Sequence, residues 1–361
     1  MADRARGSDP DVRHDSTAEL IGVELTGRKN LARYGTVSRF RTMMSDGIER
    51  EVIHAQALAR TKAPRRSVDV TIGTAPPLGT GPDGMIMHFL LKSMEAGIDG
   101  IAFGPERCRS DLRLGPDDLA LIATRLSLSN SAHAAHTIAD RLGAEQGVDL
   151  SHMLWNGISL GAVKGIAFAA LAPTYQRTMV YSHFVAPVCP NPEPVPTKGD
   201  VRRFMVGELG AMFRGTTELM MSDMMNRRPG VHADVARMIG PGLMSRYAKS
   251  TPRDRVTRTF AEAWRIAVVS GDAGTMGNRL PLDRLTTFEL FDRDQGSPPD
   301  AWRERLDRQI SAGTTRVVLL RGRHSDAARL SFQRKRARAI ADIIDQVNAG
   351  VPVAEIDHPY E

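Results

Sequence analysis

Short apolar runs of strand length alternate with longer segments of helical spacing along most of the chain. The first strong run, residues 68–72, is rich in β-branched side chains and ends in a loop of turn-forming residues. Comparable runs recur at residues 100–103, 150–155, 179–184, 317–320 and 353–356. Apolar runs of this length that are separated by helices are typical of a parallel sheet covered on both faces. The pattern therefore predicts an α/β fold with a three-layer, doubly wound and mostly parallel sheet.

Helical spacing fills the intervals between these runs. We expect helices over residues 85–96, 116–142, 162–171 and 327–347. The amino-terminal region differs, because residues 1–16 are polar and charged and have the composition of a disordered segment. The sequence from residue 17 to residue 66 has a mainly helical pattern, apart from one short strand expected at residues 21–25. No function is assigned to this region.

A break in the alternation divides the chain. A proline-rich linker at residues 190–196 follows the fourth apolar run, and residues 200–273 then have an almost purely helical pattern. Methionines crowd the first helix of this block, where they would pack a core or present a flexible surface to an acyl chain. We therefore predict four regions: an amino-terminal helical and partly disordered extension (1–66), a first part of the α/β core (67–190), a helical cap (191–290) and a second part of the core (291–361).

Composition narrows the class of protein. Of the 361 residues 42% are apolar and 25% are charged, which is ordinary for a soluble globular protein. No apolar run approaches the ~18 residues that would span a bilayer, and the amino terminus lacks the apolar segment of a secretory signal. We therefore expect a cytoplasmic protein without a transmembrane segment.

Charge and cysteine content exclude further classes. The net charge of +6 comes mainly from short arginine clusters, and aromatic residues make up only 5% of the chain. Nucleic-acid binding would favour basic clusters interleaved with aromatics or placed on a known module, so no nucleic-acid partner is expected. Cys108 and Cys189 are the two cysteines, too few for a disulfide framework and without a zinc-binding spacing. We predict no metal and no other cofactor.

One motif carries candidate chemistry. Gly157-Ile158-Ser159-Leu160-Gly161 lies between the apolar run 150–155 and the alanine-rich helical segment 162–171. Glycine on both sides of a serine allows a very tight strand-to-helix turn, which would hold the serine hydroxyl above the sheet at the start of the helix. The same text is also compatible with an ordinary glycine-rich turn and a capping serine.

A nucleophilic serine needs a histidine base, and that base needs a carboxylate to orient it. Such groups lie at the carboxyl ends of parallel strands. Asp326 follows the run 317–320, and His358 follows the run 353–356. In the order Ser159, Asp326, His358, from about residue 68 onward and apart from the helical block, the chain resembles the α/β-hydrolase fold family. It departs from that family in showing no evident strand hairpin before residue 67.

The resemblance implies a site and an activity. Ser159 would be the nucleophile, Asp326 the acid and His358 the base. The oxyanion hole would use the backbone N–H of Leu160 with one from Thr74 or Ala75. The protein would then be a serine hydrolase with a helical cap, cleaving a small-molecule carboxylic ester or thioester through an acyl-enzyme.

Other readings stay open at this point. Asp326 would also suit the cap of the helix after it, and His358 would also suit an exposed tail. His324 is a competing base, although Asp326 in the same loop would leave little room for a relay. A protein with this fold would alternatively bind a ligand without catalysis, or transfer the acyl group to an acceptor other than water.

Overall fold

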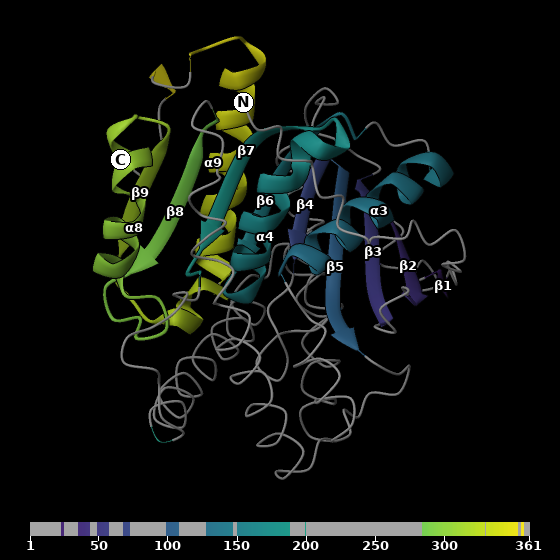
Figure 1. Ribbon diagram of the computed structural model, residues 1–361, viewed down its shortest axis with the longest axis horizontal. Coiled ribbons are helices and arrows are strands. Elements are labelled where there is room, and N and C mark those ends of the chain that lie inside the picture. The colour runs from purple at the N-terminus through teal and green to yellow at the C-terminus, as the bar shows by residue number, and fades with distance from the viewer. Residues whose placement is uncertain are drawn as a thin grey trace, which may run out of the picture.

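The computed structural model describes the backbone of eleven parts of the chain, namely residues 23–24, 35–43, 49–57, 68–72, 99–107, 128–146, 150–187, 199, 284–328, 330–352 and 355–356. Its centre is a nine-stranded sheet with the order β1-β2-β3-β5-β4-β6-β7-β8-β9 (Figure 1). Because β4 and β5 are exchanged relative to their order in the chain, the connection between them crosses over, as in doubly wound sheets.

Six strands form the parallel part of the sheet. They are β4 (Val68–Ile72), β5 (Asp99–Arg107), β6 (His152–Ile158), β7 (Thr178–Val185), β8 (Thr286–Phe291) and β9 (Thr315–Leu320). Every neighbouring pair among them is parallel. The predicted α/β fold with a mostly parallel sheet is therefore confirmed.

The amino-terminal strands contradict the helical pattern expected for residues 1–66. β1 (Val23–Glu24), β2 (Gly35–Met43) and β3 (Glu49–Ala57) pair in antiparallel fashion, and β3 continues onto β5 in the same sense. The short strand expected at residues 21–25 is present as β1. Asp46-Gly47 separates the two long strands in the sequence, and Asp-Gly between strand-like segments is a frequent hairpin signal. The hairpin ahead of the core is thus present.

Helices cover both faces of the sheet (Figure 1). They are α3 (Leu128–Gln146), α4 (Leu160–Leu171), α8 (Pro299–Ser311) and α9 (Leu330–Asn348), with short 3-10 helices η1 (Ala172–Tyr175) and η2 (His324–Ala328). α4 and α9 match the predicted helices at residues 162–171 and 327–347 closely. α8 was not predicted, and α3 corresponds to the second half of the helix expected at 116–142.

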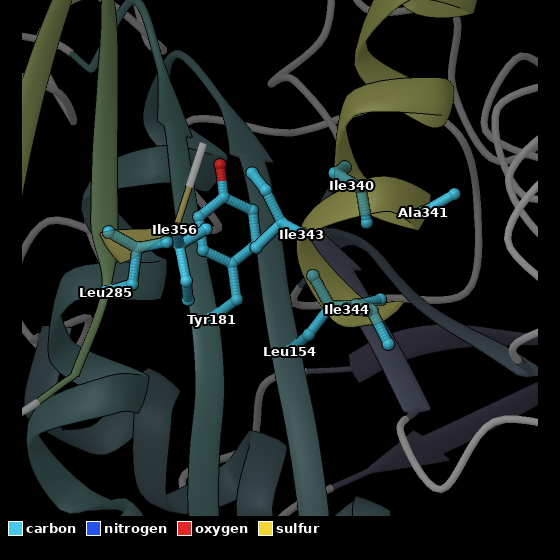
Figure 2. Close-up of a cluster of buried hydrophobic side chains, with 8 residues drawn as sticks. All are labelled: Leu154, Tyr181, Leu285, Ile340, Ala341, Ile343, Ile344 and Ile356. Carbon is cyan, nitrogen blue, oxygen red and sulfur yellow. The ribbon is translucent and has the colours of Figure 1, made fainter. Parts of the chain in front are cut away.

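Adjacent side chains on β6 show which helix covers which face. Trp155 packs against Phe168 of α4, with ring centroids 4.5 Å apart. Leu154 belongs instead to a buried cluster with α9 (Figure 2). Side chains alternate along a strand, so α4 and α9 lie on opposite faces. α8 shares the face of α4, because Trp302 contacts Phe288, whose ring lies beside that of Phe184.

The cluster under α9 is entirely apolar except for one hydroxyl (Figure 2). It joins β6, β7, the residue before β8, α9 and the carboxyl-terminal segment through these residues: Leu154, Tyr181, Leu285, Ile340, Ala341, Ile343, Ile344 and Ile356. Burial of Ile356 is complete, so the end of the described chain is held against the sheet. The strand predicted at residues 353–356 is not found among its described residues, since Glu355 is in a single helical turn and Ile356 is not in a strand.

Several predictions fall elsewhere in the chain. The helix at 85–96, the linker at 190–196 and the cap helices at 200–273 lie outside the described residues and remain predictions. β8 begins at Thr286, so the second part of the core starts before residue 291. None of the helices in the described ranges is long and apolar enough to cross a membrane.

Candidate active site

Ser159 occupies the turn between β6 and α4. Its backbone has φ 58° and ψ −123°, a conformation that residues with a Cβ rarely adopt and that costs strain. Its N–H donates to Val185 O on the neighbouring strand (2.8 Å), and its carbonyl accepts from Ala162 N (3.0 Å) and Val163 N (3.3 Å). These bonds hold the strained turn in place, which is the geometry of a nucleophile elbow.

The glycines around Ser159 permit this turn. A Cβ on Gly157 would lie 2.5 Å from the carbonyl oxygen of Gly161, where backbone cannot give way easily. A Cβ on Gly165 would lie 1.9 Å from Trp155 Nε1, so α4 can approach β6 only without a side chain there. The strand, tight turn and helix predicted from the motif are therefore confirmed.

A histidine lies directly beside the serine. Ser159 Oγ is 2.7 Å from His324 Nε2, and His324 Nδ1 is 2.7 Å from Asp294 Oδ2. The side chain of His324 is 13% exposed and that of Asp294 is fully buried. With Asp294 ionised, Nδ1–H donates to the carboxylate, which leaves Nε2 as the acceptor for the serine hydroxyl proton. The three side chains form a continuous hydrogen-bonded relay.

The second oxygen of Asp294 is fixed by the backbone. Oδ1 accepts from Gly296 N (2.8 Å) and Ser297 N (3.1 Å). Two backbone donors on one oxygen hold the orientation of the carboxylate. Asp294 can therefore present one oxygen to His324 while the other is anchored in its own loop.

No protein-family model and no curated protein matches the sequence. Solved structures do match. A proposed aryl esterase from Burkholderia cenocepacia has a TM-score of 0.51 and 14% identity, with 86% of this chain and 99% of that chain covered. The thioesterase domain from a curacin biosynthetic pathway has a TM-score of 0.44 and 13% identity, with 91% and 99% covered. This chain has the α/β-hydrolase fold. The strand order around β6 and the turn that follows it support the same conclusion.

Within this α/β-hydrolase fold, the relay draws on three strand ends along one edge of the sheet, with β7 between β6 and β8. Ser159 follows β6, Asp294 follows β8 and His324 follows β9. The two loops are also joined to each other, because Asp292 N donates to Leu320 O (2.9 Å) and Arg293 N donates to Gly322 O (3.0 Å). The acid and base loops therefore hold each other in register.

This arrangement corrects the acid and base expected from the sequence. Asp326 does not orient the histidine; its Oδ2 accepts from Arg323 N (2.8 Å), at the start of η2, as a helix cap would. The histidine at Ser159 is His324, and His358 lies outside the described residues. His324 is disfavoured in the sequence only if Asp326, in the same loop, is its acid. In the structure the acid is Asp294, from the loop after the neighbouring strand β8, so the two side chains can reach each other.

Asp294 was missed because β8 was missed. The strand Thr-Thr-Phe-Glu-Leu-Phe contains polar residues that interrupt its apolar pattern, and all but its last residue falls within the region expected to be the cap. A signal was nevertheless present. Two β-branched residues and two phenylalanines precede Asp292-Arg293-Asp294 and a turn containing Gly296, which together indicate a strand with an acidic end.

Part of the expected oxyanion hole lies in the described chain. Leu160 is the first residue of α4, where the backbone N–H groups have no acceptor within the helix. Thr74 and Ala75 lie outside the described residues, so their part stays a prediction. In the described part of the chain, no group of three His, Cys, Asp or Glu side chains is arranged to hold a metal ion.

Proposed function

We propose that the protein is a serine hydrolase that cleaves a carboxylic ester or thioester through an acyl-enzyme on Ser159. The observation that carries the proposal is the relay from Ser159 Oγ through His324 to Asp294, with 2.7 Å at each contact. A buried carboxylate, a histidine in a defined tautomer and a serine on a strained turn form the arrangement that activates a hydroxyl at neutral pH. The proposed aryl esterase of similar fold is consistent with it.

The first half of the reaction forms the acyl-enzyme. Ser159 Oγ forms a bond to the carbonyl carbon of the substrate while His324 Nε2 takes the hydroxyl proton. The electron pair of the carbonyl moves to its oxygen, and the backbone N–H of Leu160 stabilises the resulting oxyanion. As the carbonyl re-forms, the bond to the leaving oxygen or sulfur breaks, and His324 returns the proton to the leaving group.

The second half releases the acid. Water takes the place of the leaving group, His324 accepts its proton, and the water oxygen attacks the acyl carbon. Collapse of this second intermediate breaks the bond to Ser159 Oγ, which recovers its proton from His324. The Asp294 carboxylate orients the ring and stabilises the imidazolium in each step. An alcohol or thiol in place of water would give acyl transfer by the same steps.

A fluorophosphonate probe followed by peptide mass spectrometry tests the nucleophile. We expect an adduct on Ser159 in the wild type and none in Ser159→Ala, together with a loss of about 10⁴-fold or more in turnover of p-nitrophenyl acetate. Ser151→Ala is a matched control, because Ser151 Oγ also lies near a histidine nitrogen, 2.9 Å from His152 Nδ1, but at the opposite end of β6. It should keep both labelling and turnover.

The outcome also separates the competing functions. A folded wild type that neither takes the label nor hydrolyses oxygen esters or thioesters would contradict the proposal and favour a binding role. Acyl transfer would appear as ester or thioester products when alcohol or thiol acceptors are added, at the expense of free acid.

A further inference from the structure

A buried ion pair lies beneath the acid and base loops and takes no part in the relay itself. Arg336 of α9 and Glu289 of β8 are both 0% exposed. Arg336 Nε donates to Glu289 Oε2 (2.8 Å) and Nη2 donates to Oε1, so the pair is bidentate. A fully buried, bidentate pair is geometrically rigid, because both groups are planar and neither can exchange its partner for water.

The third nitrogen of the Arg336 guanidinium reaches the histidine loop. Nη1 donates to the carbonyl of Ala327, within the 3-10 helix that begins at His324. Ala327 itself belongs to a buried cluster with Phe291, the last residue of the strand that carries Glu289. One guanidinium therefore ties the backbone after His324 to the strand that leads to Asp294.

The pair also adjoins the strand that holds the serine turn. His183 Nε2 lies 3.2 Å from Glu289 Oε2, and His183 is fully buried in β7. β7 ends at Val185, whose carbonyl accepts from Ser159 N. Burial raises the pKa of the Glu289 carboxyl, but the charge and hydrogen bonds of Arg336 outweigh it and lower that pKa to about 2. Glu289 is thus ionised across the pH range in which an imidazole base operates.

We propose that Arg336 and Glu289 are positioning residues, which set the location of His324 relative to Asp294 and Ser159. The proposal rests on the proposed function for its consequence in catalysis. Neither residue touches the reacting atoms, and buried ion pairs contribute little net stability compared with apolar residues of the same size. Their distinctive feature is the hydrogen bond from Arg336 Nη1 to the carbonyl of Ala327 in the histidine loop. Displacement of a catalytic group by about 1 Å can cost about 10²-fold in rate.

Replacing Arg336 by Met and by Lys, and Glu289 by Gln, tests the proposal. We expect Arg336→Met to slow acylation of Ser159 by about 10- to 100-fold with little change in KM, because substrate contacts are unchanged. Arg336→Lys should be intermediate, since lysine can reach one acceptor but cannot form the planar fork. Glu289→Gln preserves the shape of the side chain, so this variant provides the test if Arg336→Met does not fold.

Arg177→Met is the matched control. Arg177 is another buried arginine, 6% exposed, which donates to His136 and to Asp140 far from Ser159 in the fold. It should lower the free energy of unfolding without changing the acylation rate of the folded protein. If Arg336→Met or Glu289→Gln behaves like this control, with stability lost and acylation unchanged, the pair is structural only and the proposal is overturned.

A second readout separates this proposal from the proposed function. The low-field proton resonance of His324 Nδ1–H reports its bond to Asp294 whether or not the protein turns over an ester. A shift or loss of that resonance in the Arg336 and Glu289 variants, but not in Arg177→Met, supports positioning even if the wild type proves inactive. An unchanged resonance in folded variants of an active enzyme refutes positioning while the proposed function stands.

Discussion

Two aspartates near His324 have different roles because their oxygens have different partners. Asp294 divides its carboxylate between His324 and two backbone N–H groups. Asp326 instead caps the first turn of η2 through Arg323 N. An amide keeps the capping acceptor of a carboxylate, but it removes the charge that stabilises an imidazolium and fixes its tautomer.

We therefore expect opposite results from the same change at the two positions. Asp294→Asn should lower kcat for p-nitrophenyl acetate by about 10³- to 10⁴-fold, because His324 loses the partner that sets its tautomer. Asp326→Asn should keep kcat within about threefold of the wild type. Steady-state kinetics of the two variants at one pH provides the comparison. A large loss at Asp326 with little loss at Asp294 would restore the acid first expected from the sequence.

At the scale of elements, the β6–α4 turn depends on backbone approaching backbone. The atoms that a Gly157 side chain would meet are the carbonyl of Gly161 and the N of Ala162, both in the first turn of α4. Such atoms cannot move without shifting the helix and therefore the Leu160 N–H. Strain at Ser159 is tolerated because the neighbouring strand and helix fix it.

Gly157→Ala should therefore cost both stability and activity. We expect a loss of about 1–3 kcal/mol in the free energy of unfolding, as for other overpacked sites, and at least about a tenfold slower acylation of Ser159. Gly313→Ala is the control, since its Cβ would meet nothing within 4 Å and only its φ of +73° is unfavourable. That variant should cost about 1 kcal/mol and leave acylation unchanged. Normal acylation in Gly157→Ala would show that the turn is less tight than described.

Elements were predictable where the signal is local. The motif around Ser159 needs only its own strand, turn and helix, so the sequence located it. The partnership of Asp294 with His324 depends on β8 lying beside β9, a pairing between distant segments that no local pattern reports. The β2–β3 hairpin was missed for a related reason. Its charged residues are spaced as on an exposed helix, and only the pairing of the two strands identifies them as a hairpin.

For the whole molecule, one buried histidine couples fold stability to pH. His136 of α3 is fully buried between the rings of Phe168 and Tyr175, at centroid distances of 3.7 and 4.4 Å. Nε2 donates to Phe168 O (3.0 Å), and Nδ1 accepts from Arg177 (2.6 Å). Burial, together with the charges of Arg177 and His133, lowers the pKa of His136 to about 3, despite the opposing effect of the hydrogen bond to the Phe168 carbonyl.

This shift predicts a loss of stability in mild acid. The unfolded chain binds a proton on His136 below about pH 6.5, whereas the folded chain does so only near pH 3, so stability present above pH 6.5 is lost as the pH falls. Between pH 6.5 and 4.5 the expected loss is about 2–3 kcal/mol. His136→Gln keeps a donor and an acceptor without titrating. Denaturant unfolding at several pH values gives the free energy of unfolding as a function of pH. This free energy should fall less steeply with decreasing pH in His136→Gln than in the wild type. An equal fall in both proteins would contradict the assignment.

The central claim is that His324 is the base for Ser159, and the rate of acylation measures it most directly. Stopped-flow formation of the acetyl-enzyme from p-nitrophenyl acetate should be compared in the wild type, His324→Ala and His358→Ala. We predict that His324→Ala loses about 10⁴-fold or more while His358→Ala stays within a few-fold of the wild type. Fast acylation in His324→Ala, together with its loss in His358→Ala, would contradict the account.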